Sequence, residues 1–75
     1  MELNDFIKNF AEQFDETDAS EFKADTVYRD LDEWSSMSGL AIIAMVDDCY
    51  GKTVTSADFK NSVTIEDLFN IVCAK

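Results

Sequence analysis

The sequence predicts an all-α fold, a small four-helix bundle of three longer helices and one short helix within a single domain over residues 1–75. Two observations favour helices over strands. Apolar residues recur at three- and four-residue spacing near both ends of the chain, which is the period of an amphipathic helix and not the alternation of a strand. The chain also contains no proline, which would interrupt a helix. A chain of this length has room for one small core.

The first predicted helix begins near Leu3. Its apolar residues face one side, and Asn, Asp, Lys, Glu and Gln fill the other, so the segment is expected to cover the core with one face. The apolar residues are Leu3, Phe6, Ile7, Phe10 and Phe14.

Residues 15–35 lose this periodicity and are rich in Asp, Glu, Ser and Thr. A connection of this length in a compact domain is expected to be functional or tied down by contacts. A short helical turn is expected around residues 19–23. The side chains expected to tether the segment are Phe22, Val27, Tyr28 and Leu31.

The second long helix is predicted over residues 36–50, because no proline intervenes and Gly51 provides a helix stop. Its apolar residues surround the axis, whereas a domain of this size has too few other elements to bury both faces. We therefore expect an exposed apolar patch beside Ser36. One face carries Gly39, Ile42, Ile43, Val46, Cys49 and Tyr50, and the other carries Met37, Leu40, Ala41 and Ala44 with Asp47 and Asp48 nearby.

Two further helices are predicted near the carboxyl end. Residues 53–56 have the composition of a short strand, but a single strand has nothing to pair with, so a brief helix from Ser56 to Phe59 is preferred. Thr64 is expected to cap the last helix, with Asp67 at the reciprocal position of a capping box. Its buried stripe is expected to comprise Ile65, Leu68, Phe69 and Val72.

The chain is strongly acidic, with 16 Asp and Glu against 6 Lys and Arg and a net charge of −10. This charge argues against nucleic acid and anionic membranes as partners and favours basic protein surfaces. The amino-terminal residues do not resemble a signal peptide and no apolar run reaches membrane-spanning length, so we expect a cytoplasmic protein without stable membrane insertion. Cys49 and Cys73 are expected to be buried free thiols.

The chemistry-bearing residues argue against an enzyme. The chain has no histidine to activate a serine, no G-x-S-x-G turn and no spacing typical of a metal site. A serine that another enzyme modifies needs only exposure, a fixed position and surroundings that tolerate an anion, and the first turn of a helix provides these. Of the two serines at residues 35 and 36, Ser35 is interpreted as the helix cap and Ser36 as the modified residue.

The run Trp34-Ser35-Ser36-Met37 resembles the modification site of acyl carrier proteins and related phosphopantetheine carriers, where Asp-Ser-Leu or Trp-Asp-Ser-Leu is usual. The pair Asp30-Leu31 and the run Thr64-Ile65-Glu66-Asp67-Leu68 are also similar to motifs of that family, and the stretch over which these motifs are spread, residues 30–68, is about half of the chain. The resemblance implies a four-helix bundle of acyl-carrier-protein type.

The resemblance further implies that a phosphopantetheinyl transferase attaches 4′-phosphopantetheine from coenzyme A to Ser36. The terminal thiol would hold acyl groups as thioesters for acyl-loading and acyl-processing enzymes, and the carrier itself, a monomer, would not be catalytic. The partner-docking positions of the family correspond to Met37, Leu40, Ala41, Asp47 and Asp48. A growing acyl chain can enter the interior of such carriers, where the corresponding residues, interpreted here as packed core, are Ile42, Ile43, Val46, Phe59, Ile65, Leu68 and Phe69.

The sequence departs from the family at the start of this helix. Ser35 replaces the usual Asp, and Ser38 and Ala41 stand where fatty-acid carriers commonly have acidic residues. Because electrostatic complementarity mainly sets encounter rate and partner choice, we predict a specialised freestanding carrier in fatty acid, polyketide or related lipid biosynthesis that docks more through apolar contact. The remaining attraction is expected from Asp47, Asp48 and the loop acids Asp30, Asp32 and Glu33.

Two alternatives remain open. One is a carrier of amino acids or peptides, including a D-alanyl carrier. The other is an interaction module that has the carrier fold but never receives the arm, which the substitution at Ser35 keeps under consideration.

Overall fold

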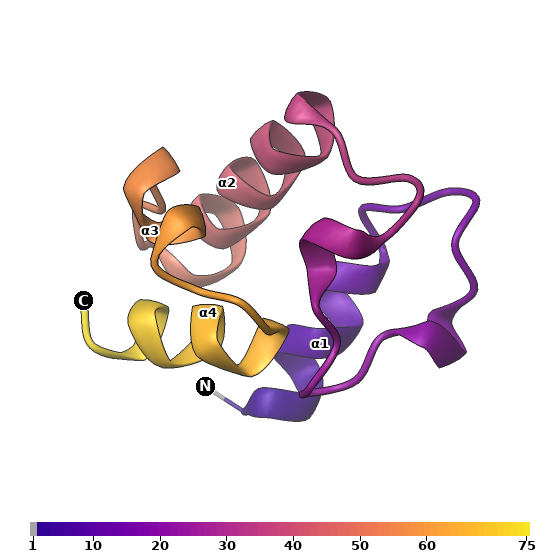
Figure 1. The fold of residues 1–75 in the computed structure, drawn as a ribbon. Helices are drawn as coiled ribbons and strands as arrows, with labels where there is room; N and C mark the ends of the chain where they lie inside the picture. Colours follow the sequence, from indigo (N-terminus) through magenta and orange to yellow (C-terminus); the bar gives the residue numbers. More distant parts are fainter. Residues whose placement is uncertain (1) are drawn as a thin grey trace.

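The structure, a computed structural model, describes residues 2–75 and is a small helical bundle (Figure 1). Within these residues there is no strand, and the sole β-type pairing is an isolated antiparallel bridge between Val27 and Thr64. The prediction of three longer helices and one short helix is confirmed. The helices are α1 (Leu3–Ala11), α2 (Ser36–Tyr50), α3 (Ser56–Lys60) and α4 (Ile65–Cys73), with 3-10 helices η1 (Ala19–Glu21) and η2 (Tyr28–Asp30) in the first connection.

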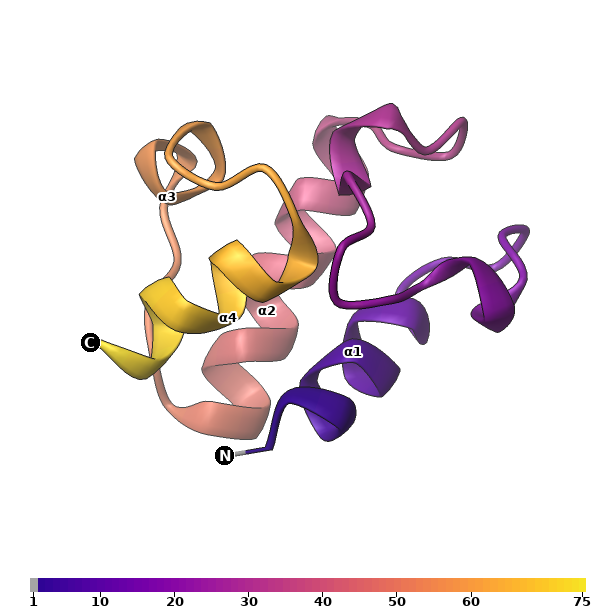
Figure 2. The same ribbon diagram turned by 60° about the horizontal axis from the view of Figure 1, so that its bottom comes forward.

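The helices pack around one core. α1 contacts both α2 and α4, and α3 contacts α4 at the other end of the bundle. Figure 2 shows α4 lying across α2, with α3 in the connection between them. None of the helices in the described part of the chain has the length and apolarity needed to cross a membrane.

Aromatic side chains fill much of the core. Neighbouring rings run from α1 through the first connection to α3, with centroids 5.6 Å apart for Phe10 and Tyr28, 5.0 Å for Tyr28 and Trp34, and 5.7 Å for Trp34 and Phe59. Such pairs contribute about 0.5–1.5 kcal/mol each beyond their buried area. The buried apolar residues are Phe6, Phe10, Phe14, Phe22, Tyr28, Ile42, Met45, Val46, Val54, Ile65, Leu68 and Val72.

α1 ends at Ala11, although the apolar spacing continues to Phe14. The chain tightens there, because the N–H groups of Gln13 and Phe14 donate to carbonyls three residues earlier, at Phe10 and Ala11. Phe14 is nevertheless buried, and its ring stacks on Phe10 with centroids 5.6 Å apart. The apolar pattern therefore identified the buried residue correctly but not the end of the helix.

Residues 15–35 are tied down, as expected. Phe22 and Tyr28 are buried, whereas Val27 and Leu31 are half-buried. Backbone contacts add to these tethers, since the N–H of Ile65 donates to the carbonyl of Thr26 at 3.1 Å and that of Glu66 to the carbonyl of Ala24 at 3.0 Å. The first connection is thereby fixed to the start of α4.

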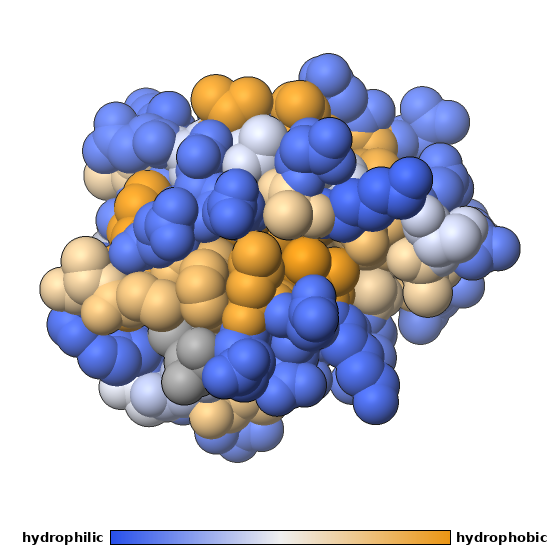
Figure 3. Space-filling model, turned by 90° about the horizontal axis from the view of Figure 1, so that it is seen from below, coloured by the Kyte–Doolittle hydropathy of each residue, from blue (hydrophilic) through white to orange (hydrophobic). Residues whose placement is uncertain are grey.

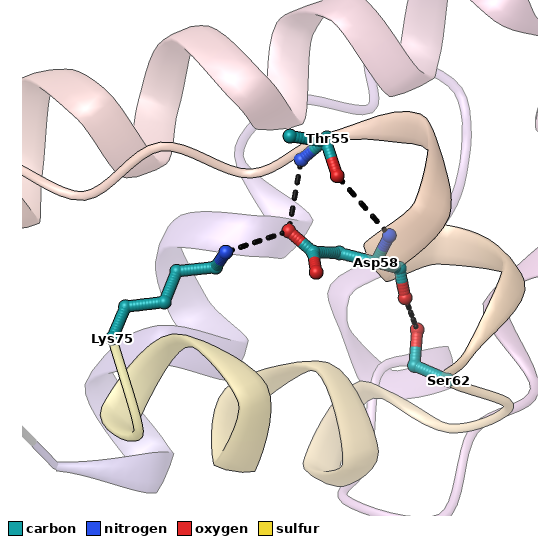
Figure 4. Close-up of polar contacts among 4 residues, drawn as sticks. All are labelled: Thr55, Asp58, Ser62 and Lys75. Atoms are coloured by element: carbon teal, nitrogen blue, oxygen red, sulfur yellow. Dashed lines mark hydrogen bonds and ion pairs between the residues drawn. The ribbon is translucent and has the colours of Figure 1, made fainter.

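The short helix α3 is held by polar contacts that centre on Asp58 (Figure 4). Its carboxylate accepts the backbone N–H of Thr55 at 2.9 Å and pairs with the Lys75 ammonium at 3.0 Å, while its carbonyl accepts the Ser62 hydroxyl at 2.9 Å. The backbone hydrogen bond from Thr55, followed by the contact with Lys75, lowers the pKa of Asp58 below its usual value. These contacts join α3 to the end of α4.

The prediction that Cys49 and Cys73 are buried is wrong, because both free thiols are exposed. In the last turn of α2, the neighbouring Tyr50 faces α1, and its ring lies 5.9 Å from that of Phe6. Cys49 is rotated 100° away from Tyr50 toward the open side. Cys73 follows the buried Val72 and is likewise rotated off the buried stripe of α4.

The inward face of α2 differs from the predicted face, because Cys49 is exposed and Met45 takes part in the face instead. Met45, which the sequence pattern omitted, is buried together with Gly39, Ile42 and Val46. Of the interior residues named above, Ile42, Val46, Ile65 and Leu68 are fully buried, and Ile43, Phe59 and Phe69 pack on the core while partly exposed. These residues form the packed core.

Candidate functional site

The start of α2 separates the roles of two adjacent serines. Ser35 is the N-cap in an extended conformation (φ −152°, ψ 177°), and its hydroxyl accepts the backbone N–H of Ser38 at 3.4 Å. The Ser38 hydroxyl in return accepts the backbone N–H of Ser35 at 3.3 Å and donates to the carbonyl of Glu33 at 3.0 Å. Ser35 is therefore the cap, as predicted.

Ser36 is the first residue of α2 and is exposed. Its hydroxyl takes no part in the cap, and the first turn of α2 contains no acidic residue. Because the amino end of a helix carries unpaired N–H groups and the positive end of the helix dipole, an anion on the Ser36 oxygen would be stabilised there. The Ser36 hydroxyl is thus accessible to solvent, is carried by a helical backbone and lies at the positive end of the α2 dipole.

An exposed apolar patch flanks Ser36, as the sequence predicts. The exposed fraction is 78% for Met37 and 66% for Leu40, the two highest among the large exposed apolar residues of the described chain. Isolated apolar residues on a surface are ordinary, but these two lie on the same exposed side of one helix, next to the serine.

The five predicted docking residues do not all lie around one hollow. Leu40 borders a groove between α2 and α3 that also includes Ser36. Ala41, Asp47 and Asp48 border a different hollow, where α2 faces the carboxyl end of α1. Both aspartates are exposed and Ala41 is half-buried. Met37 is exposed near the start of the helix and borders neither of these two hollows. Apolar contact near Ser36 and negative charge near the end of α2 are therefore separated along the helix.

The groove beside Ser36 has a volume of about 400 Å³ and a mixed lining. Trp34, Leu40 and Phe59 contribute apolar surface. Arg29 and Lys60 add two cations from segments far apart in the sequence. Sequence reasoning missed both cations, because no local pattern indicates that residues 29 and 60 lie near residue 36.

Of the predicted loop acids, Asp30 and Asp32 are exposed, but Glu33 is engaged within the chain. Its carboxylate accepts the Thr17 hydroxyl at 2.7 Å and the backbone N–H groups of Asp15 and Glu16 at 3.0 and 3.1 Å. The hydrogen bond from Thr17, aided by those backbone groups, lowers the pKa of Glu33 below its usual value. Glu33 therefore fixes the loop directly before Trp34, in addition to carrying charge.

A second apolar groove lies along α1, lined in part by Ile7, Ala11 and Phe14, and does not include Ser36. Figure 3 shows the face that lies at the bottom of Figure 1, where apolar side chains form a band bordered by hydrophilic ones.

In residues 2–75, no group of three or more His, Cys, Asp and Glu side chains is placed to hold a metal ion.

Comparisons with protein-family models, with curated proteins and with solved structures gave no match.

Proposed function

We propose that this protein is an acyl carrier whose 4′-phosphopantetheine arm is attached to Ser36. The observation that carries the proposal is that Ser35 and Ser36 have different roles at the start of α2. Ser35 caps the helix, and Ser36 remains exposed at its positive end beside Met37 and Leu40. The resemblance of residues 34–37 and 64–68 to the motifs of acyl carrier proteins supports the same assignment.

The attachment requires no catalytic group from this chain. The Ser36 oxygen would attack the pyrophosphate phosphorus of coenzyme A that carries the pantetheine, and the new O–P bond would replace the bond to 3′,5′-ADP, which leaves. A phosphopantetheinyl transferase would take the hydroxyl proton. This chain contributes an accessible oxygen on a fixed backbone and a helix end that stabilises the phosphodiester.

The partners of this carrier are then enzymes that load and process acyl groups, with basic and apolar docking patches. The net charge of −10 favours basic partner surfaces, and the exposed apolar pair of Met37 and Leu40 provides contact area near the arm. Because the first turn of α2 lacks acidic residues, partner choice should differ from that of a standard fatty-acid carrier. We therefore propose a specialised cytoplasmic carrier of fatty acid, polyketide or related lipid biosynthesis.

Intact-mass spectrometry tests the attachment. The protein is incubated with coenzyme A and a broad-specificity phosphopantetheinyl transferase, and Ser36→Ala is compared with Ser35→Ala. One phosphopantetheine increment is expected on the wild type and on Ser35→Ala, and none on Ser36→Ala. Circular dichroism of each variant controls for folding.

The same experiment decides against the proposal if no transferase adds the increment to a folded wild-type protein, or if Ser36→Ala is still modified. The first result would favour an interaction module that never receives the arm. Charging of the loaded protein with amino acids but not with acyl groups would favour an aminoacyl, peptidyl or D-alanyl carrier.

A further inference from the structure

Two of the six cations of this chain border the groove beside Ser36, and neither is neutralised. Arg29 and Lys60 form no ion pair, although the chain contains 16 carboxylates, and the one ion pair among residues 2–75 joins Lys75 to Asp58. In so acidic a protein, two unpaired cations on one groove produce a local positive field. The groove is therefore suited to a ligand that carries negative charge.

Arg29 is fixed in place at this groove. Its guanidinium donates to the carbonyl of Ser62 at 2.9 Å and lies over the ring of Tyr28, 6.0 Å from the centroid. A guanidinium has five N–H donors in a planar fork, so this contact leaves donors for an anion.

Lys60 reaches the groove from α3. The contacts of Asp58 with Thr55 and Lys75 hold this short helix against the end of α4, as Figure 4 shows. The position of the Lys60 backbone therefore does not depend on an ion pair of Lys60 itself.

The floor of the groove is apolar and aromatic. The rings of Trp34 and Phe59 lie edge to face, with centroids 5.7 Å apart, and both approach α2 at Gly39. A Cβ atom at Gly39 would lie 3.8 Å from Phe59 and 3.9 Å from Trp34. Leu40 continues this apolar surface outward.

A 4′-phosphopantetheine arm carries both kinds of group that this lining suits, an anion and apolar carbon atoms. Its phosphodiester anion comes first, at the serine oxygen, and a carbon atom with two methyl groups follows. Charge complementarity thus favours the arm over an uncharged acyl chain as the occupant. Ser36 itself borders the groove, so the arm begins at its rim.

We propose that the arm of the loaded, uncharged carrier lies in the groove between α2 and α3, with its phosphodiester held by Arg29 and Lys60 and its dimethyl group on Trp34 and Phe59. This inference rests on the proposed attachment at Ser36. The two cations act on the arm and not on the transfer reaction, so loading itself should remain possible without them.

Nuclear magnetic resonance of the loaded protein tests this placement. The ¹⁵N-labelled indole of Trp34, the single tryptophan of the chain, reports on the groove, and the ³¹P resonance reports on the phosphodiester. Apo and loaded proteins are compared for the wild type, Lys60→Gln, Arg29→Lys and the double variant Arg29→Gln/Lys60→Gln. Lys8→Gln/Lys23→Gln is the matched control, because it also removes two positive charges, from residues that do not border the groove. Intact mass and thermal melts establish that each sample is loaded and folded.

In the wild type, we expect loading to shift the Trp34 indole resonance. This shift and the ³¹P position should persist in the control and in Arg29→Lys, which keeps the charge. In Lys60→Gln, the indole shift on loading should become smaller and the ³¹P resonance should move toward that of a solvent-exposed arm. Both effects should be largest in the double variant. Lys60→Gln remains informative if the loss of the Arg29 contact with Ser62 disturbs the fold.

Three results would overturn the placement. A loaded wild type with an unshifted Trp34 indole would have its arm in solvent. A shift that survives in the folded double variant would exclude the cations as its cause. A shift that appears only after acylation would make the acyl group the occupant. Failure to load the wild type is a separate result, which removes the proposed function and this inference with it.

Discussion

The hydroxyl of Ser35 and the backbone N–H of Ser38 are joined by a 3.4 Å hydrogen bond, and the reciprocal bond from the Ser35 N–H to the Ser38 hydroxyl measures 3.3 Å. This pair closes the amino end of α2 with two neutral side chains. Capping boxes usually place Glu or Gln at the second position, so the site has its cap without the usual negative charge. The neighbouring Ser36 is thereby exposed on an ordered backbone.

Ser35→Asp should restore negative charge next to Ser36 without loss of the cap. Asp caps a helix about as well as Ser, and an anion at this end of a helix adds about 0.3–1 kcal/mol at low salt. We expect severalfold faster modification of Ser36 by a transferase with a basic docking surface, and a smaller gain at high salt. Ser35→Asn is the control, because it caps without charge. Equal rates for the three proteins would contradict a role of this charge in recognition.

Leu40→Gln should weaken partner binding with little effect on folding. The side chain is 66% exposed, so the free energy of unfolding should change by less than about 0.5 kcal/mol. If Leu40 is a docking contact, the transferase kcat/KM should fall by about tenfold, equivalent to about 1.4 kcal/mol. Val63→Gln removes another exposed apolar residue, 49% exposed, from outside the groove and should leave the rate unchanged. Similar rates for both variants would exclude Leu40 as a docking contact.

Glu33→Gln should destabilise the protein in a pH-dependent way. Hydrogen bonds to its carboxylate lower the pKa of Glu33 in the folded protein below the reference value of 4.5. The stabilisation is therefore fully present above about pH 4.5 and is lost as the pH falls through the folded pKa. Chemical unfolding of wild type and variant should differ at pH 7 and converge in acid. A difference that stays constant over this range would mean that the charge of Glu33 does not hold the loop.

Tyr28 and Ser62 should show energetic coupling in a double-mutant cycle. Their hydroxyl oxygens lie 2.5 Å apart in the core, and burial is the main cause of the raised pKa of Tyr28. Tyr28→Phe and Ser62→Ala should each lower the free energy of unfolding by about 1–2 kcal/mol, with a coupling of at least about 0.5 kcal/mol. Urea unfolding of the four proteins measures this. Strict additivity would show that each hydroxyl is satisfied by its backbone partners alone, at Phe59 and Asp58.

Gly39→Ala should stabilise the protein, whereas Gly51→Ala should destabilise it. A Cβ at Gly39 would make ordinary contacts at 3.8 and 3.9 Å, and Ala is favoured over Gly within a helix by about 0.5–1 kcal/mol. Gly51 has φ 64°, a conformation unfavourable for Ala. Melting temperatures should rise for the first variant and fall for the second, by about 4–8 °C per kcal/mol in a domain of this size. A fall for Gly39→Ala would mean that the two rings cannot accommodate the methyl group.

Local patterns in the sequence predicted α2 and α4 closely. Ser35 and Thr64 are the caps, Gly51 in its left-handed conformation ends α2, and Asp67 completes the second capping box. These features depend on groups within a few residues of one another, which is why they can be read from the sequence. The end of α1 was misplaced because Phe14 has no stop residue before it, and its burial depends on Phe22 and Trp34 in the first connection.

What the sequence by itself determined is the helical character of the chain, the caps that distinguish Ser35 from Ser36, and the excess of apolar surface on α2. The tertiary structure alone decided that Cys49 and Cys73 are exposed, that Glu33 holds residues 15–17, and that Arg29 and Lys60 border the same groove as Ser36. The physical reason is the separation along the chain of the residues that interact. Caps and periodicity act over one or two turns, whereas the groove is formed by three segments that come together only when the aromatic core closes.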